Sequence, residues 1–223
     1  MAKIKKIIGL FLSSVLIISM CYVVAEPAIV DAVTDSATVT ATVTEEISIT
    51  QPDNATMSAT IPGMTGNPGA PVTSSLTWTV KTANAAGFNM KIKASQASAM
   101  FQDGTYLFTD YTPAVTGTPD YSWASPASAA AEFGFTVEPA TDADAVAAFL
   151  DNGSNACNVG STQTDEKCWF GLNGTTDVDM INRSTNTTSS GEAEIVKFQA
   201  ESNAKFLKEG AYVATITVTA TMN

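Results

Sequence analysis

The sequence predicts an all-β protein, an immunoglobulin-like or jelly-roll β-sandwich with one short helix. Three observations carry this prediction. Apolar and polar residues alternate strictly in several short segments, as in strands that have one face on a core. Segments rich in Gly, Pro and Asn separate these strands. The 223 residues are 45% hydrophobic, which is enough for a buried core.

The first 25 residues have the pattern of a secretory signal peptide. Three lysines precede residue 7, and the apolar stretch 7–24 follows. Small residues place cleavage after Ala25, or as late as Ala32. An uncleaved anchor is one alternative, since about 18 apolar residues can span a bilayer. A lipoprotein modified at Cys21 is another. With cleavage, we expect a secreted, extracellular or cell-surface protein without membrane attachment.

The charge and the residue types exclude several classes of function. The formal net charge is −11, and it becomes 8 − 22 = −14 without residues 1–25, which hold three lysines and no acid. This excess disfavours a nucleic-acid partner, because phosphate binding needs clustered Lys and Arg. The chain has no histidine, so it has no Ser-His-Asp triad and no His-ligated zinc. It also carries no phosphate-binding or dinucleotide loop. We therefore expect no enzymatic activity and no cofactor.

Two cysteines remain after the leader, Cys157 and Cys168. In an oxidising compartment we expect them to form a disulfide. It closes a loop of 12 residues, counted inclusively, and contributes about 3 kcal/mol in the chain-entropy account. The same loop is rich in oxygen ligands, so a solvated acidic loop and a structural calcium site are the two interpretations, of which we favour the first. The calcium candidates are Asp151, Asn152, Ser154 and Asn155.

The first alternating segment covers residues 37–49. Its pattern is interrupted at Glu45, which indicates a bulge or a strand that leaves its sheet. The segment 51–73 is rich in Pro, Gly, Thr and Asn and is predicted to be a long loop. Residues 76–80 and 88–94 alternate on either side of an Asn- and Gly-containing turn, which predicts a hairpin.

Residues 100–126 lose the alternation and are rich in aromatic residues. The side chains could form a stacking platform for a sugar, or they could cover the open end of a sandwich, which we favour because large rings tolerate a half-wet position. The rings in question are those of Tyr106, Tyr111, Tyr121 and Trp123.

The remaining chain contains a helix signal and three further strands. Residues 133–137, 196–200 and 212–222 alternate as strands, the last most clearly. Thr141 and Asp144 match a capping box for a short helix. Nothing divides the chain further, so residues 33–223 are predicted to be a single β-sandwich with loop excursions at 51–73, 100–126 and 151–168.

The first and last strands are long, Thr-rich and β-branched, and such strands expose hydrogen-bonding edges. The first one could leave its own domain and complete the sheet of a neighbouring copy, with Val39, Ala41 and Val43 as the inserted side chains. The last strand is the candidate acceptor edge. Repeated head to tail, this exchange builds a filament. The alternative is that residues 37–49 pair within their own chain.

The segment Glu209-Gly210-Ala211-Tyr212-Val213-Ala214-Thr215-Ile216-Thr217-Val218-Thr219 resembles the closing strand of several bacterial surface domains. These are spore-coat-U and fimbrial-type pilin domains, WxL cell-surface domains and TasA-like matrix fibre proteins. The resemblance implies a filament, pilus or matrix subunit without enzymatic activity. The competing hypothesis is a monomeric adhesion or glycan-binding module that uses residues 100–126.

Overall fold

The computed structural model describes residues 36–172 and 174–223. The predicted signal peptide, with cleavage after residue 25 or as late as 32, therefore lies outside the described residues. The chain divides into two units after Thr42, and residues 43–223 form the compact unit that is described below. In the part of the chain that the structure describes, no helix is long and apolar enough to cross a membrane.

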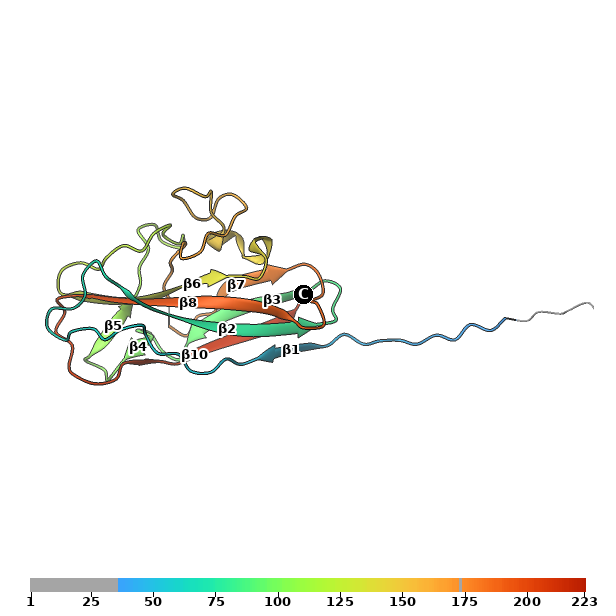
Figure 1. Cartoon of the computed structure of the whole chain (residues 1–223), viewed down its shortest axis with the longest axis horizontal. Helices are drawn as coiled ribbons and strands as arrows, with labels where there is room; N and C mark the ends of the chain where they lie inside the picture. Colours follow the sequence, from blue (N-terminus) through green and yellow to red (C-terminus); the bar gives the residue numbers. More distant parts are fainter. Residues whose placement is uncertain (1–35, 173) are drawn as a thin grey trace, which may run out of the picture. The chain divides into compact units, whose positions relative to one another are not determined.

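The compact unit is all-β and sandwich-like, as predicted, with two sheets that share one core (Figure 1). The larger sheet has the order β1-β2-β8-β6-β5-β4-β9, and the smaller sheet has the order β10-β3-β7. All strand pairs are antiparallel except β5 and β6. The strands are β1 (Ile47–Thr50), β2 (Val72–Thr82), β3 (Phe88–Ala94), β4 (Met100–Phe101), β5 (Leu107–Asp110), β6 (Ala130–Glu138), β7 (Val178–Arg183), β8 (Glu192–Asn203), β9 (Val213–Ala214) and β10 (Ile216–Met222).

The core forms because alternate side chains of facing strands point inward. On β3, Phe88, Met90 and Ile92 are fully buried. The lysines between them point outward, and Lys91 and Lys93 form ion pairs with acidic residues of and beside β7. On the opposite sheet the rings of β6 and β8 fill the core, and a central pair of them stacks with ring centres 5.8 Å apart. The period-two pattern in the sequence thus marks the buried face of these strands.

The hairpin that was predicted for residues 76–94 is wrong. Its two strands exist, but β2 pairs with β1 and β8, whereas β3 pairs with β10 and β7. The turn at residues 84–87 therefore crosses from one sheet to the other. The Asn84 side chain holds this crossing, because its Oδ1 accepts a hydrogen bond from the Ala86 amide and its Nδ2 donates to the Gly87 carbonyl. A local turn signal does not tell whether the strands that follow it pair with each other.

The predicted helix after Thr141 is also wrong, and two short 3₁₀ turns replace it. These turns are η1 (Asp142–Asp144) and η2 (Ala147–Phe149), and the Thr141 side chain makes no capping hydrogen bond. Between them Ala145 and Val146 are extended. The reason is tertiary: the Val146 amide donates to the Met180 carbonyl on β7, so the chain follows a strand edge rather than completing a helix.

The loop excursions differ in how much regular structure they hold. Residues 51–71 contain no strand, and β2 begins at Val72. The segment 100–126 includes β4 and β5 and therefore contributes two strands to the large sheet. Residues 151–168 form isolated bridges instead of strands.

Candidate functional site

The predicted donor residues lie on a segment that we call the arm, residues 37–44. No residue of the arm is in a strand, and all are exposed. Val39 is 93% exposed and Val43 86% exposed. Strand pairing begins only at Ile47, opposite Thr82. Of the alternating segment 37–49, only the last few residues therefore pair with another strand of the described chain, as part of β1.

The predicted acceptor edge, β10, pairs with β3 on one side. The Ser95 amide donates to the Thr215 carbonyl, so every second residue from Thr215 onward directs its backbone toward β3. The residues between them, beginning with Ile216 and Val218, direct their amide and carbonyl groups away from β3. Among the described residues no strand pairs with that second edge.

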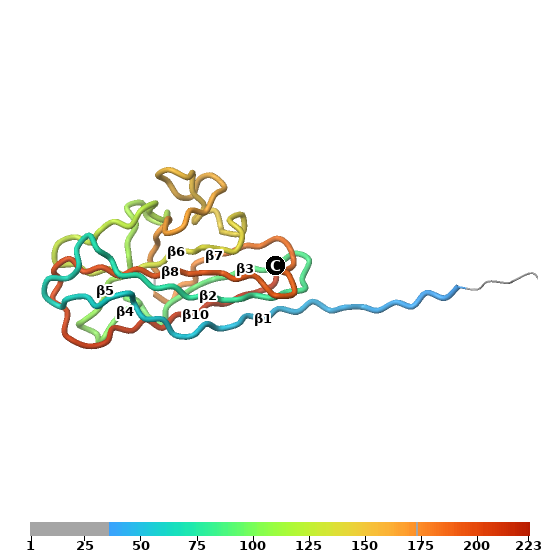
Figure 2. Tube along the Cα trace, in the orientation of Figure 1, coloured from blue at the N-terminus to red at the C-terminus, as the bar shows by residue number. Residues whose placement is uncertain are grey.

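A large groove opens beside this edge. Its volume is about 1690 Å³, above the roughly 300–1,000 Å³ of ordinary small-molecule pockets. The inner face of β2 lines its floor with Ser74, Leu76 and Trp78, and β10 lines one wall with Ile216 and Val218. Segments 51–64 and 206–215 complete the rim, and Figure 2 shows the chain after β1 and the chain before β10 running along the same side of the unit.

The four predicted ligand-binding aromatic residues do not form one platform. Tyr106 contacts Phe206, with ring centres 6.2 Å apart. Tyr111 instead stacks on Trp123 at 4.3 Å and is buried. The Tyr121 ring lies under the ammonium group of Lys167, 5.0 Å from it. The structure brings Tyr111 and Trp123 together and gives Tyr106 different contacts.

Hydrogen bonds from the polar atoms of both rings hold the stacked pair in place. The Tyr111 hydroxyl donates to Asp120 at 2.6 Å, and the Trp123 indole N–H donates to Glu201 at 2.8 Å. Burial, followed by the hydrogen bond to Asp120, raises the pKa of Tyr111 above its usual range. Gly134 on β6 makes room for the pair, because a Cβ there would lie 2.7 Å from the Tyr111 Cβ. We call this arrangement the aromatic cluster.

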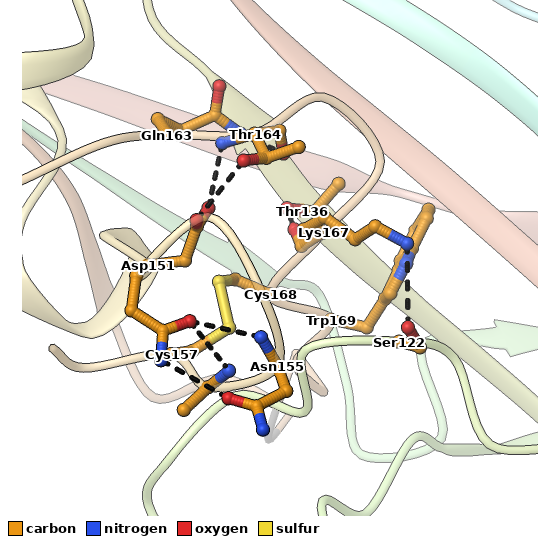
Figure 3. The surroundings of a disulfide bond; sticks show 12 residues. Ser122, Thr136, Asp151, Asn155, Cys157, Gln163, Thr164, Lys167, Cys168 and Trp169 are labelled. Atoms are coloured by element: carbon orange, nitrogen blue, oxygen red, sulfur yellow. Dashed lines mark hydrogen bonds between the residues drawn. A yellow bond between two sulfur atoms is a disulfide. The ribbon is translucent and has the colours of Figure 1, made fainter. Parts of the chain in front are cut away.

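The predicted disulfide between Cys157 and Cys168 is present (Figure 3). It ties the loop 151–168 to the strand-like segment at Trp169, whose backbone pairs with Asp120. Lys167, next to the disulfide, donates to Ser122 across the same junction. The bridge therefore fastens this loop beside the aromatic cluster.

The calcium candidates lie in the loop, but their oxygens accept hydrogen bonds from the loop itself. The carboxylate of Asp151, fully buried, accepts from the amides of Gly153 and Thr164 and from the Thr164 hydroxyl. Asn152 Oδ1 accepts from three backbone amides, including those of Ser154 and Asn155. Within the described residues, no group of three or more His, Cys, Asp or Glu side chains is placed to hold a metal ion.

A buried carboxyl group on β8 has an unusual proton affinity. Glu194 is 1% exposed, and its Oε2 accepts a hydrogen bond from the Ala140 amide. Its Oε1 has no hydrogen-bond partner among the described residues. Burial raises the pKa of Glu194 to about 7. Asp144 lies nearby and is paired with Arg183 at 2.6 Å. The sequence carries a signal for Glu194 that the strand prediction for residues 196–200 did not use, because Glu194 is in phase with the inward-facing Val196 and Phe198.

Comparison with protein-family models, with curated proteins and with solved structures finds no match. The sequence pattern singled out Val39, Ala41 and Val43 and the last strand as donor and acceptor candidates, but it gave no sign of the groove. Its lining comes from residues 49 to 218, so no single segment carries a signal for it.

Proposed function

We propose that this chain is an exported structural subunit of a cell-surface filament, pilus or matrix, and that it assembles by donating its N-terminal strand to a neighbouring copy. One observation carries the proposal. The arm is a strand-forming sequence, alternating and uncharged from residue 37 to 44, that is exposed and belongs to none of the strands that the structure describes.

Such a segment is stabilised when it joins the edge of a sheet. Two valines on one face of the arm are almost fully exposed, and burying a valine side chain is favourable by about 1.5–3 kcal/mol. The Val- and Thr-rich composition favours extended backbone, whose solvated amide and carbonyl groups can form a ladder with the open edge of another sheet. Strand addition satisfies both requirements at once.

The disulfide supports the exported part of the proposal, because such bonds persist in oxidising compartments. The large acidic excess supports a soluble subunit before assembly. Among the observations on the described residues, none favours catalysis. A non-enzymatic role is therefore part of the same proposal.

The test compares the chain starting at residue 33 with a double variant, Val39→Asp plus Val43→Asp. We expect the parent to form filaments or large oligomers by light scattering and negative-stain microscopy, and the variant to remain monomeric and folded. Thr40→Asp plus Thr42→Asp is the matched control, because it adds the same charge to the other face of the arm. The control should assemble less strongly than the parent but more strongly than the valine variant.

Two results would contradict the proposal. A parent chain that stays a monodisperse monomer removes self-assembly, and glycan screening of the Tyr121 and Trp123 region would then test the binding-module hypothesis. A valine double variant that unfolds as a monomer shows instead that the arm packs within its own chain.

A further inference from the structure

We infer that the groove beside β10 is the acceptor for the arm of a second copy of this chain, with the inserted strand lying between β2 and the β9–β10 segment. This inference rests on the proposed function and specifies where the donated strand binds. It depends on three properties of the groove: two open strand edges, an apolar lining, and a position that the chain's own arm reaches only by reversing direction.

The first open edge belongs to β2. The strand β1 covers β2 only from Thr79 onward. At the other end, the backbone of Thr73 exchanges two hydrogen bonds with Ser58, of 2.8 and 3.1 Å. The backbone amide and carbonyl groups of the odd-numbered residues of β2 thus point to this edge. In the described chain, no hydrogen bond joins those of Ser75 or Thr77 to a neighbour there.

The second open edge belongs to β9 and β10. These strands form one extended run that pairs first with β4 and then with β3, so the chain passes from one sheet to the other at Thr215. The same edge of the run stays unpaired throughout the described structure. The strand β10 has 7 residues, and Ala37 to Val43 of the arm also spans seven positions, so the apolar part of the arm matches this edge in length.

The apolar surface of the unit is concentrated at the groove. Nine large hydrophobic side chains are exposed in the described residues. Two of them are the valines of the arm, and four line the groove. These four are Ile49, Met64, Phe206 and Val213. An inserted strand with small apolar side chains would cover both sets, and neither the arm nor the floor of the groove at β2 carries a charge.

The direction of the chain at β1 indicates that the occupant comes from another copy. The Glu46 carbonyl accepts hydrogen bonds from the Ala83 amide and the Thr82 hydroxyl, so the chain enters β1 beyond the end of β2. The groove lies toward the other end, at Val72 to Trp78. To enter its own groove, the chain would have to reverse direction immediately before Glu46, where no Gly or Pro favours a turn. A second copy needs no such reversal.

The first experiment compares Val218→Asp with Thr219→Asp in the chain starting at residue 33. Val218 lines the groove, whereas its neighbour is exposed on the outer face of β10 beside Lys91. We expect Val218→Asp to lose assembly as completely as the arm double variant, and Thr219→Asp to assemble like the parent. Normal assembly of Val218→Asp would overturn the inference while the proposed function stands.

The second experiment remains informative if Val218→Asp fails to fold. Cysteine variants are made in the chain starting at residue 33, whose own two cysteines, Cys157 and Cys168, are bonded to each other. The Ala41→Cys chain is mixed with the Ser74→Cys chain, and a short bis-maleimide linker is added. We expect a cross-linked dimer from the mixture and a much weaker band with Ser75→Cys, because the Ser75 side chain is exposed on the other face of β2. Assembly that requires the arm but gives no Ser74 cross-link would place the donated strand elsewhere and overturn this inference. Assembly that is unchanged by the arm double variant would overturn the proposed function itself.

Discussion

The aromatic cluster and the groove are two apolar regions of one molecule that differ in how their surface is covered. In the aromatic cluster, loops return over the large sheet, the rings stack, and the indole and hydroxyl groups have partners. In the groove, loops form only the rim, side chains such as Phe206 and Val213 are more than half exposed, and two strand edges lack a ladder in the described residues.

This difference indicates that the aromatic cluster stabilises the fold, whereas the groove is available for association. A chain that covers one apolar region with hydrogen-bonded loops could cover another in the same way. Large exposed apolar patches on soluble proteins commonly mark interaction sites. We therefore expect substitutions in the aromatic cluster to act mainly on stability, and substitutions in the groove to act mainly on assembly.

The largest effect on stability is expected from Trp123→Ala. It removes a ring that stacks on Tyr111 and meets Trp169 edge to face, and it leaves an oxygen of the fully buried Glu201 without its donor. Together these losses should lower the free energy of unfolding by about 4 kcal/mol. Chemical denaturation of the monomeric arm double variant measures this cost. Tyr121→Ala, at a half-buried ring, should lower the free energy of unfolding by about 1 kcal/mol. Equal costs for the two variants would contradict the stabilising role of the aromatic cluster.

Reduction of the disulfide should have the next largest effect. Replacing Cys157 and Cys168 by serine releases the loop that is fastened beside the aromatic cluster. The expected loss is about 3 kcal/mol in the free energy of unfolding. Thermal unfolding with and without a reductant provides the measurement, and the serine variant should show no response to the reductant. Because the bridge lies away from the groove-lining residues, assembly below the melting temperature should persist.

Between pH 5 and pH 8, a pH effect of about 2.5 kcal/mol is expected from Glu194. Its folded-state pKa, about 7, lies above the ordinary value of 4.5, so the folded protein holds this proton more tightly than the unfolded chain. The stabilisation is therefore complete below pH 4.5 and is lost as the pH rises through 7. Glu194→Gln should flatten the dependence in urea unfolding between pH 5 and pH 8. A slope that survives in this variant would contradict the assignment, and Glu192→Gln is the control that should retain it.

The smallest effect on stability is expected inside the groove. Leu76→Ser changes a half-buried side chain on the floor, so the monomer should lose about 1 kcal/mol. Its cross-strand neighbour Val196 is buried, and Val196→Ala should cost about 2 kcal/mol. The same Leu76 variant should nevertheless reduce assembly strongly by light scattering. A variant that assembles normally would contradict the distinction between the two regions.

Period-two patterns predicted β2, β3, β6, β8 and β10, because a sheet with one buried face imposes that period directly. They did not predict β7, although its Met180 and Ile181 lie in the core. They were insufficient to predict the pairing of β2 with β8, which lie more than a hundred residues apart in sequence. The helix prediction failed at Val146 for a related reason: a hydrogen bond to Met180 outweighed the local capping signal. Pairing partners are a property of the assembled sheet, and a local pattern does not contain them.

For the candidate site, too, local sequence patterns predicted some features and missed those that depend on distant residues. The alternation of residues 37–49 predicted a strand former but left donation and pairing within the chain open. The disulfide was predicted from the two cysteines that follow the signal-peptide pattern. The stacking of Tyr111 on Trp123 was not predictable, because it depends on Gly134, a residue of another strand that leaves room for the rings. The groove depends likewise on β1 being short, which the alternating sequence before Ile47 gave no reason to expect.

If the arm of one copy occupies the groove of another, a chain without a working arm and a chain without a working groove should complement each other. One chain carries Val39→Asp and Val43→Asp, so it has an intact groove and a disabled arm. The other carries Val218→Asp, so it has an intact arm and a disabled groove. Light scattering should find each a monomer alone and an equimolar mixture a one-to-one dimer that grows no further. A mixture that remains monomeric, from two folded chains, would contradict the claim.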